Sequence, residues 1–156
     1  MFQFFKKHQK PLFEGLCDIH NHLLPSIDDG SKSVAMSSLM LEGFLALGFE
    51  SVIPTPHVYQ ELYPNTPQTV KKAFGELSQH CLSTQPVRVP SYAAEYMVDE
   101  VFMKKLETGV PSLLLKEKYI LLEINFFGTT PMLESACFQL QQKNMFPILA
   151  HPERYY

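Results

Sequence analysis

The sequence predicts an α/β fold in which parallel strands alternate with helices in one domain. Short apolar runs and longer amphipathic stretches follow one another from about residue 16 to the end of the chain, giving five β/α units. Strands that alternate with helices join into a parallel sheet through right-handed crossovers. The 156 residues, of which 46% are hydrophobic and 19% charged, have the composition of an ordinary globular domain. We therefore expect either a doubly wound sheet or a barrel.

The first unit begins with a strand over residues 16–21. Ser31 or Ser33 can cap the helix that follows, and Gly48 is placed as its C-terminal stop. Helical spacing predicts that the buried face of this helix contains Met36, Leu39, Met40, Gly43, Phe44 and Leu47.

The later units follow the same signals. Thr66 and Pro67 form a cap followed by proline at the first helical position. Residues 1–15 are expected to form an N-terminal arm packed on a domain that spans 16–156. The remaining strands are expected over residues 51–54, 87–96, 119–124 and 146–150, and the remaining helices over 67–82, 97–108 and 131–143.

The stretch from residue 17 to residue 30 reads CDIHNHLLPSIDDG and holds many side chains that bind metals. On an extended strand, Asp18, His20 and His22 point to the same face, because side chains alternate with a period of two. Neutral imidazoles suit Zn, Mn, Fe or Ni. A ligating histidine usually needs a carboxylate or carbonyl behind it to fix its tautomer, and Asp18 is placed for that role.

A second carboxylate follows in the same stretch. Asp29 precedes Gly30, which can adopt a positive φ and turn the chain so that this carboxylate returns over the histidines. An isolated H-x-H pair is weak support for a metal site, and D-D-G is also an ordinary solvated turn. Together the two motifs favour a metal site.

Further polar residues lie at or just beyond the expected strand ends. In parallel α/β folds the carboxyl ends of the strands form the functional rim. Taken singly, His57 reads as a loop histidine and Glu123 as an ion-pair partner. Taken jointly they predict a metal site at the rim. The residues at these positions are His20, His22, His57, Glu95, Glu123 and His151.

Charge and cysteine usage exclude several classes of protein. The net charge of −3 argues against a nucleic-acid partner, which needs a basic face. The odd number of cysteines, without C-x-x-C spacing, argues against a disulfide framework and indicates a reducing compartment. No apolar run approaches the roughly 20 residues of a transmembrane helix, so we expect a cytoplasmic protein without an integral membrane segment. The cysteines are Cys17, Cys81 and Cys137.

Six motifs together resemble the PHP (polymerase and histidinol phosphatase) superfamily. They are most similar to its bacterial manganese-dependent protein-tyrosine phosphatases of capsule and exopolysaccharide biosynthesis. The resemblance extends from about Leu16 to the last residue. It implies a distorted, seven-stranded, TIM-like β/α barrel with a metal centre. The motifs are D-I-H-N-H, I-D-D-G, T-P-H at 55–57, A-E-Y at 94–96, L-L-E-I at 121–124 and A-H-P-E-R-Y at 150–155.

The resemblance also implies roles for individual residues. Two or three metal ions are expected, with Mn as the first choice and Fe, Mg or Zn as alternatives. Glu95 would be the bridging carboxylate and Arg154 the phosphate-binding arginine. Family members continue to a late D-x-H pair, so this chain is expected to hold the five N-terminal units of the barrel and to lack its C-terminal third. The implied metal ligands are His20, His22, Asp29, His57, Glu95, Glu123 and His151.

These residues suit hydrolysis of a phosphate ester. Closely spaced metals lower the pKa of a bridging water, so that a hydroxide can attack phosphorus in line. Arg154 can hold two phosphoryl oxygens in a bidentate fork; its simpler role is an ion pair with Glu153. A thiolate mechanism is disfavoured, because Cys17 faces away from the ligands and no C-x5-R motif is present.

The expected substrate is a phosphotyrosine protein, in first place a tyrosine kinase of polysaccharide export. Two alternatives stay open. One is a small-molecule phosphatase that hydrolyses a compound such as histidinol phosphate. The other is a non-catalytic fragment, since a barrel of this type typically needs about 200 residues or more. Open strand edges in such a fragment would also favour a homo-oligomer.

Overall fold

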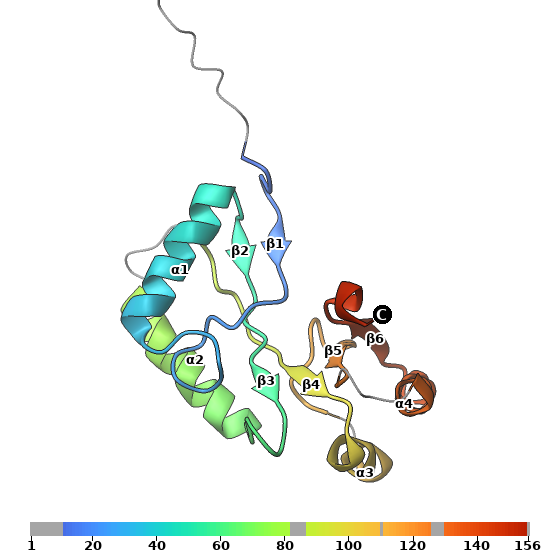
Figure 1. The fold of residues 1–156 in the computed structure, drawn as a ribbon. Helices are drawn as coiled ribbons and strands as arrows, with labels where there is room; N and C mark the ends of the chain where they lie inside the picture. The colour runs from blue at the N-terminus through green and yellow to red at the C-terminus, as the bar shows by residue number, and fades with distance from the viewer. Residues whose placement is uncertain (1–10, 82–86, 110, 126–129, 156) are drawn as a thin grey trace, which may run out of the picture.

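The computed structural model describes residues 11–81, 87–109, 111–125 and 130–155, and Figure 1 shows their arrangement. Strands and helices alternate along most of this chain, as expected for an α/β fold. In chain order the elements are β1 (Cys17–Asp18), α1 (Val34–Leu47), β2 (Ser51–Val52), β3 (His57–Val58), α2 (Pro67–Cys81), β4 (Glu95–Met97), α3 (Glu100–Thr108), β5 (Tyr119–Glu123), α4 (Thr130–Gln142), β6 (Phe146–Leu149) and the short 3-10 helix η1 (Pro152–Arg154).

All strand pairs in the two sheets are parallel, which confirms the predicted fold class. β1 pairs with β2, and the second sheet has the order β3-β4-β5-β6. α1 and α2 pack against each other along one flank of the sheets, whereas α3 and α4 lie beside β4 to β6 (Figure 1). Each strand of the second sheet therefore pairs with the strand that precedes or follows it in the sequence.

The prediction of one strand over residues 87–96 is wrong, because this segment forms two separate pairings. Arg88 forms an isolated parallel bridge with Ser51, whereas β4 begins only at residue 95 and pairs with β3. Pro90 lies between the two parts and has no N–H to donate, so it interrupts a strand with neighbours on both sides.

β3 is a strand that the sequence does not predict, since residues 55–65 were expected to be a loop. It pairs with β4 through His57 and Glu95 and then through Val58 and Tyr96. A two-residue strand offers no periodic pattern, and only the adjacent β4 provides the pairing partner. The described residues therefore contain six strands where the sequence predicts five.

The ends of α1 confirm the predicted caps. Ser33 is the N-cap and its side chain accepts a hydrogen bond from the backbone N–H of Met36. Gly48 adopts φ 95° at the C-terminus, a left-handed conformation that suits glycine. Ser31, the alternative cap, is buried, and its hydroxyl lies 2.8 Å from that of Ser37.

The predicted buried face of α1 is wrong in part. Its fully buried side chains are Ser37 and Leu41, whereas Met40 and Phe44 are half-buried against the core. The Ser37 hydroxyl donates to the carbonyl of Leu23, so a hydrogen bond orients this helix and a hydrophobicity pattern does not register it. The predicted positions that are instead exposed are Met36 (44%), Leu39 (66%), Leu47 (47%) and Gly43.

The other helices begin close to their predicted positions. α2 starts at Pro67, and Thr66 accepts a hydrogen bond from the N–H of Thr69. α3 starts at Glu100 with Asp99 as its N-cap, later than predicted, because residues 95–97 belong to β4. No helix in the described part of the chain is both long and apolar enough to cross a membrane.

The core lies between the sheets and the helices. It contains fully buried aliphatic side chains from strands and helices, such as Val52, Leu106, Ile120 and Leu122. Burying each of these contributes about 1.5–3 kcal/mol before opposing terms. Of the predicted N-terminal arm, residues 1–10 lie outside the described part of the chain, and Phe13 stacks on Phe49 with ring centroids 4.6 Å apart.

Candidate metal centre

Glu95, the first residue of β4, lies at the centre of the histidine cluster and is fully buried. Its Oε1 lies 3.0 Å from Nε2 of His20 and 3.0 Å from Nε2 of His151. Its Oε2 lies 3.4 Å from Nε2 of His22 and 3.3 Å from Nδ1 of His57. A buried carboxylate with both oxygens surrounded by imidazoles has the arrangement of a ligand shared between cations.

Two further carboxylates approach the same histidines. Glu123 Oε1 lies 2.7 Å from Nδ1 of His57, and Glu123 Oε2 lies 3.6 Å from Nε2 of His151. Asp29 Oδ1 lies 3.5 Å from Nε2 of His57 and 4.0 Å from Nδ1 of His22. The fold therefore brings together all seven residues that the sequence singles out as metal ligands.

Three overlapping groups have ligand atoms close enough to hold an ion. Within each group the ligand atoms lie within 4.8 Å of one another. His22, His57 and Glu95 each belong to two groups, so neighbouring ions would share ligands. The groups are His20, His22 and Glu95; His22, Asp29 and His57; and His57, Glu95 and Glu123.

The parallel ladder positions the ligands on β3, β4 and β5. His57 is the register partner of Glu95, so their side chains emerge together, and Glu123 lies opposite Met97 at the end of β5. The prediction that the candidate ligands lie at or just beyond strand ends holds for His20, His22, Glu123 and His151. His57 and Glu95 begin their strands, because the ladder from β3 to β4 starts at the metal centre.

The loop after β1 carries the first two histidines. β1 ends at Asp18, so His20 and His22 lie beyond the strand on which they were predicted. Asn21, between them, donates its backbone N–H to the Thr55 hydroxyl at 3.1 Å and accepts from the Thr55 N–H at 2.9 Å. This buried pair of hydrogen bonds anchors the loop beside the segment that leads to β3.

Asp28 is a functional residue that sequence reasoning missed. Its carboxylate is buried, and its Oδ2 lies 2.8 Å from Nδ1 of His22. The same carboxylate accepts hydrogen bonds from the backbone N–H groups of Gly30 and His57. Asp18, which was expected to fix a histidine tautomer, instead accepts from the backbone N–H of His20 and from the side chain of Asn21.

Gly30 has a different reason to be glycine from the one the sequence suggests. Its φ is not positive; the described glycines with positive φ are Gly15 and Gly48. A Cβ at residue 30 would instead lie 2.2 Å from both Cβ and the carbonyl oxygen of His22. The loop therefore passes so close to His22 that no side chain fits. The motif I-D-D-G indicates that glycine is needed at residue 30, but it does not reveal that the close approach to His22 is the reason.

His151 has an unusual backbone and a tyrosine neighbour. It adopts φ 30° and ψ 57°, in the left-handed region that non-glycine residues seldom occupy. The Tyr155 hydroxyl lies 3.1 Å from Nδ1 of His151 and accepts from the backbone N–H of Ile124 at 3.2 Å. Tyr155 therefore helps to orient His151, a role that the motif A-H-P-E-R-Y does not reveal by itself.

Electrostatics follow from the close packing of imidazoles and carboxylates. Burial alone would lower the pKa of His22, but hydrogen bonds with Asp28 and Glu95 raise it to about 10. Burial would raise the pKa of Glu95, but its contacts with His20 and His22 hold the pKa well below its usual range. Burial alone would lower the pKa of His57, but the hydrogen bond and the negative charge of Glu123 outweigh burial and raise this pKa.

The residues present fit a bound cation. Glu95 Oε2 and His57 Nδ1 are buried and form no hydrogen bond of good geometry. Buried polar atoms normally have partners, because an unpaired one costs about 1–3 kcal/mol. The donor set contains only imidazole nitrogens and carboxylate oxygens, which suit Mn, Fe or Zn. A cation between these atoms would provide the interactions that they lack.

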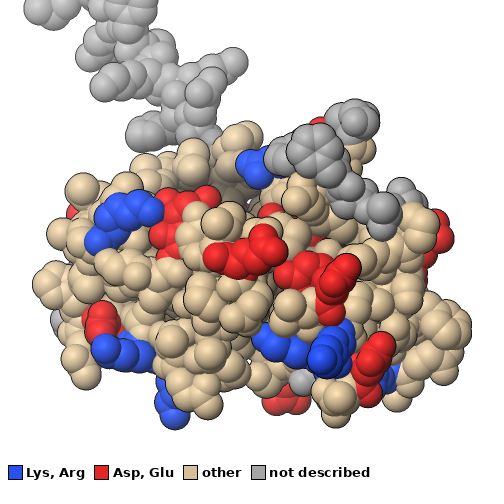
Figure 2. Space-filling model, turned by 60° about the horizontal axis from the view of Figure 1, so that its bottom comes forward, with Lys and Arg blue, Asp and Glu red and all other residues tan. Residues whose placement is uncertain are grey.

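Arg154 lies at the end of η1, three residues after His151, and is exposed. Within the described part of the chain, its guanidinium forms no ion pair within 4.0 Å, so the ion pair with Glu153 is not present. Arg154 is thus available to an anion. Figure 2 shows acidic side chains near the middle of one face, with most of the Lys and Arg side chains around them or below.

The chain is similar to known proteins. Residues 16–156 match the family described as capsular polysaccharide synthesis, CpsB/CapC. The tyrosine-protein phosphatase YwqE of Bacillus subtilis is 30% identical over 148 residues, which cover 89% of this chain and 55% of YwqE. The tyrosine-protein phosphatase CpsB of Streptococcus pneumoniae is 23% identical over 140 residues, covering 90% of this chain and 58% of CpsB.

A solved structure is also similar. It comes from work on YwqE from Bacillus subtilis and CpsB from Streptococcus pneumoniae, described as unique metal-dependent tyrosine phosphatases. The TM-score is 0.77 at 31% identity, covering 89% of this chain and 56% of the other. This chain thus spans about half the length of the curated relatives it matches. By its match over residues 16–156, the chain belongs to the CpsB/CapC family of capsular polysaccharide synthesis.

Proposed function

We propose that this chain carries most of the metal centre of a metal-dependent phosphotyrosine-protein phosphatase. The observation that supports it best is the position of Glu95, whose two oxygens lie within 3.4 Å of four histidine nitrogens from three segments of the chain. The matched relatives named tyrosine-protein phosphatases supply the substrate class.

His20, His22, Asp29, His57, Glu95, Glu123 and His151 would hold two or three divalent cations. Mn is our first choice, with Fe, Mg or Zn as alternatives. When bound, such cations lower the pKa of water and neutralise charge on a phosphoryl group.

The remaining steps belong to side chains of this chain. Arg154 donates two N–H groups to phosphoryl oxygens and stabilises their charge as the ester bond breaks. Asp28 and Tyr155 keep His22 and His151 in place. Tyrosine leaves as a phenolate with a pKa near 10, so it needs less protonation by the enzyme than an alkoxide does.

The wider context is also part of the proposal. The parallel order of β3 to β6 supports a distorted, seven-stranded barrel, of which residues 16–156 would form the larger part and residues 1–15 an arm. A tyrosine kinase of polysaccharide export is the substrate we favour, because the family is one of capsular polysaccharide synthesis. The cysteines with described side chains, Cys17 and Cys137, are free, in keeping with a cytoplasmic location.

Metal analysis combined with phosphatase assays tests the proposal. The chain, purified with added Mn, should bind metal and hydrolyse a phosphotyrosine peptide with a higher kcat/KM than histidinol phosphate. A His20→Ala, His22→Ala double variant should lose bound metal and activity together. A higher kcat/KM on histidinol phosphate would favour a small-molecule phosphatase. Bound metal without hydrolysis of either compound would favour a non-catalytic fragment.

A further inference from the structure

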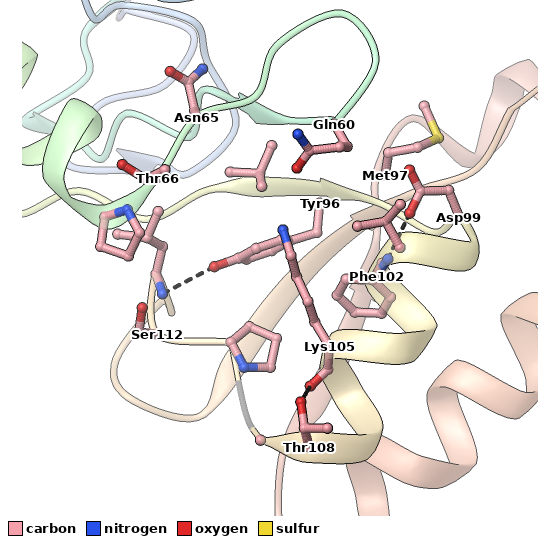
Figure 3. A pocket seen from close by; sticks show the side chains of 16 residues that line it. Gln60, Asn65, Thr66, Tyr96, Met97, Asp99, Phe102, Lys105, Thr108 and Ser112 are labelled. Atoms are coloured by element: carbon pink, nitrogen blue, oxygen red, sulfur yellow. Dashed lines mark hydrogen bonds between the residues drawn. The ribbon is translucent and has the colours of Figure 1, made fainter.

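A second cavity lies outside the metal centre, between the start of α2 and the length of α3 (Figure 3). Its volume is about 350 Å³. Pockets that hold small ligands span roughly 300–1,000 Å³, so this one suits a single large side chain. Its lining residues come from the start of α2, from both ends of α3 and from the strands β3 and β4.

The β3–β4 ladder connects the cavity to the metal centre. His57 and Glu95 form one register pair and belong to the metal centre, whereas the next pair, Val58 and Tyr96, lines the cavity. Side chains of consecutive strand residues point to opposite faces. The two sites therefore lie one register pair apart on the same two strands.

A short hairpin carries residues that contact both sites. Tyr59 and Tyr63 pair with each other through antiparallel backbone hydrogen bonds. The Tyr63 ring stacks on the His57 ring at 5.3 Å, while Gln60 on the same hairpin lines the cavity. An extended peptide that reaches the metal centre can cross this hairpin and place a neighbouring residue at the cavity.

The walls of the cavity are mainly apolar, and its polar groups are largely satisfied. Val101, Phe102 and Leu113 supply apolar surface. The Tyr96 hydroxyl accepts from the backbone N–H of Leu113, and the Asp99 carboxylate accepts from the N–H of Phe102 at the start of α3. Each of these two side chains thus has a hydrogen-bond partner within the protein.

Lys105 is the exception. Its side chain extends from α3 across the cavity toward Tyr96 and Gln60 (Figure 3). Within the described residues its ammonium has no carboxylate within 4.0 Å, unlike Lys72, which pairs with Glu76. An apolar cavity with one unpaired cation at its mouth is complementary to an apolar side chain with an acidic group beside it.

We propose that this cavity binds the substrate peptide beside the phosphotyrosine, taking up one apolar side chain while Lys105 pairs with an adjacent acidic residue. The inference rests on the proposed phosphatase function. It adds a preference for sequence around the phosphotyrosine, which the metal centre alone does not supply.

The catalytic test compares phosphotyrosine peptides with p-nitrophenyl phosphate, which is too small to reach the cavity. In the peptides one Leu-Glu pair is moved through the positions on either side of the phosphotyrosine. Lys105→Glu should lower kcat/KM for the best Leu-Glu peptide by about threefold to tenfold, through KM, and leave p-nitrophenyl phosphate unchanged. Replacing Glu by Lys in that peptide should restore activity to the variant. Lys104→Glu, the same charge change on the neighbouring exposed residue, is the control.

A binding test separates this inference from the proposed function. NMR titration with the unphosphorylated Leu-Glu peptide should shift resonances of Val101, Phe102 and Leu113, and Lys105→Glu should weaken these shifts while Lys104→Glu should not. Val101→Trp, at a 39% exposed position, should fill the cavity and abolish them. Shifts without any hydrolysis would refute the phosphatase proposal alone. Absence of saturable shifts, equal loss with Lys104→Glu, or equally tight binding of phenylacetate would overturn the peptide site.

Discussion

His22 Nδ1 lies 2.8 Å from Oδ2 of Asp28, so the other ring nitrogen, Nε2, is the one directed at Glu95. A hydrogen bond of this kind fixes both the tautomer and the plane of a ligating imidazole. Asp28 accepts from three donors with its two oxygens: the His22 ring and the backbone N–H groups of Gly30 and His57. The carboxylate thus orients His22 and also joins the segments that carry His22 and His57.

Asp28→Asn should weaken metal binding, by about 10- to 100-fold. An amide has one acceptor oxygen and one donor nitrogen, so at least one of the three donors would face an NH₂ group. Asp18→Asn is the matched control, because only Oδ1 of Asp18 accepts hydrogen bonds and an amide retains one such oxygen. Calorimetric titration with Mn measures both. Equal effects would show that Asp28 has no special role.

Gly30→Ala should disturb the metal centre because of the 2.2 Å contact with His22. The loop would have to move, and we expect loss of metal together with a lower melting temperature. Gly43→Ala is the control: a Cβ there meets nothing within 4 Å, and alanine in a helix interior stabilises by about 0.5–1 kcal/mol. Metal content and thermal unfolding of both variants are the measurements. An unaltered Gly30→Ala protein would contradict the close approach.

Arg154→Ala should lower turnover on a phosphotyrosine peptide by about 10²–10³-fold, as loss of one charge-stabilising donor does elsewhere. Its stability should hardly change, within about 0.5 kcal/mol, because the side chain is exposed and has no ion pair within the described residues. Steady-state kinetics and thermal unfolding separate the two effects. A large loss of stability with nearly full turnover would refute the assignment to phosphate binding.

The 156-residue chain should self-associate. β1 and β6 each end a sheet, and exposed apolar side chains lie next to them, including Leu16 (54%) and Phe146 (51%). Such edges favour association. Light scattering after size-exclusion chromatography should give a mass above 17.9 kDa, and Leu16→Lys with Phe146→Lys should reduce it.

Leu62→Lys is the control for this experiment. Leu62 is 65% exposed but lies on the hairpin after β3, far in the sequence from both β1 and β6. If it reduced the mass as much as the edge substitutions did, general surface hydrophobicity would explain the association. A wild-type chain that runs as a monomer would contradict the prediction directly.

Local sequence patterns are enough to predict the parallel α/β class and the candidate metal ligands. The helix cap at Ser33 and the C-terminal stop at Gly48 could be predicted because each depends on residues only a few positions away. The candidate ligands were recognisable because imidazoles and carboxylates recur beside apolar runs. Predictions of this kind do not depend on how distant segments pack against each other.

Which carboxylate contacts which histidine depends on contacts between segments that are distant in the sequence. The sequence pattern assigns the role of fixing a histidine tautomer to Asp18, but Asp28 is the carboxylate that contacts His22, because the loop folds back until residue 30 touches His22. The buried face of α1 was likewise decided by the hydrogen bond from Ser37 to Leu23, against the hydrophobicity pattern. These outcomes depend on close approach between segments and on pairing of buried polar groups, and neither is encoded by the spacing of residues along the chain.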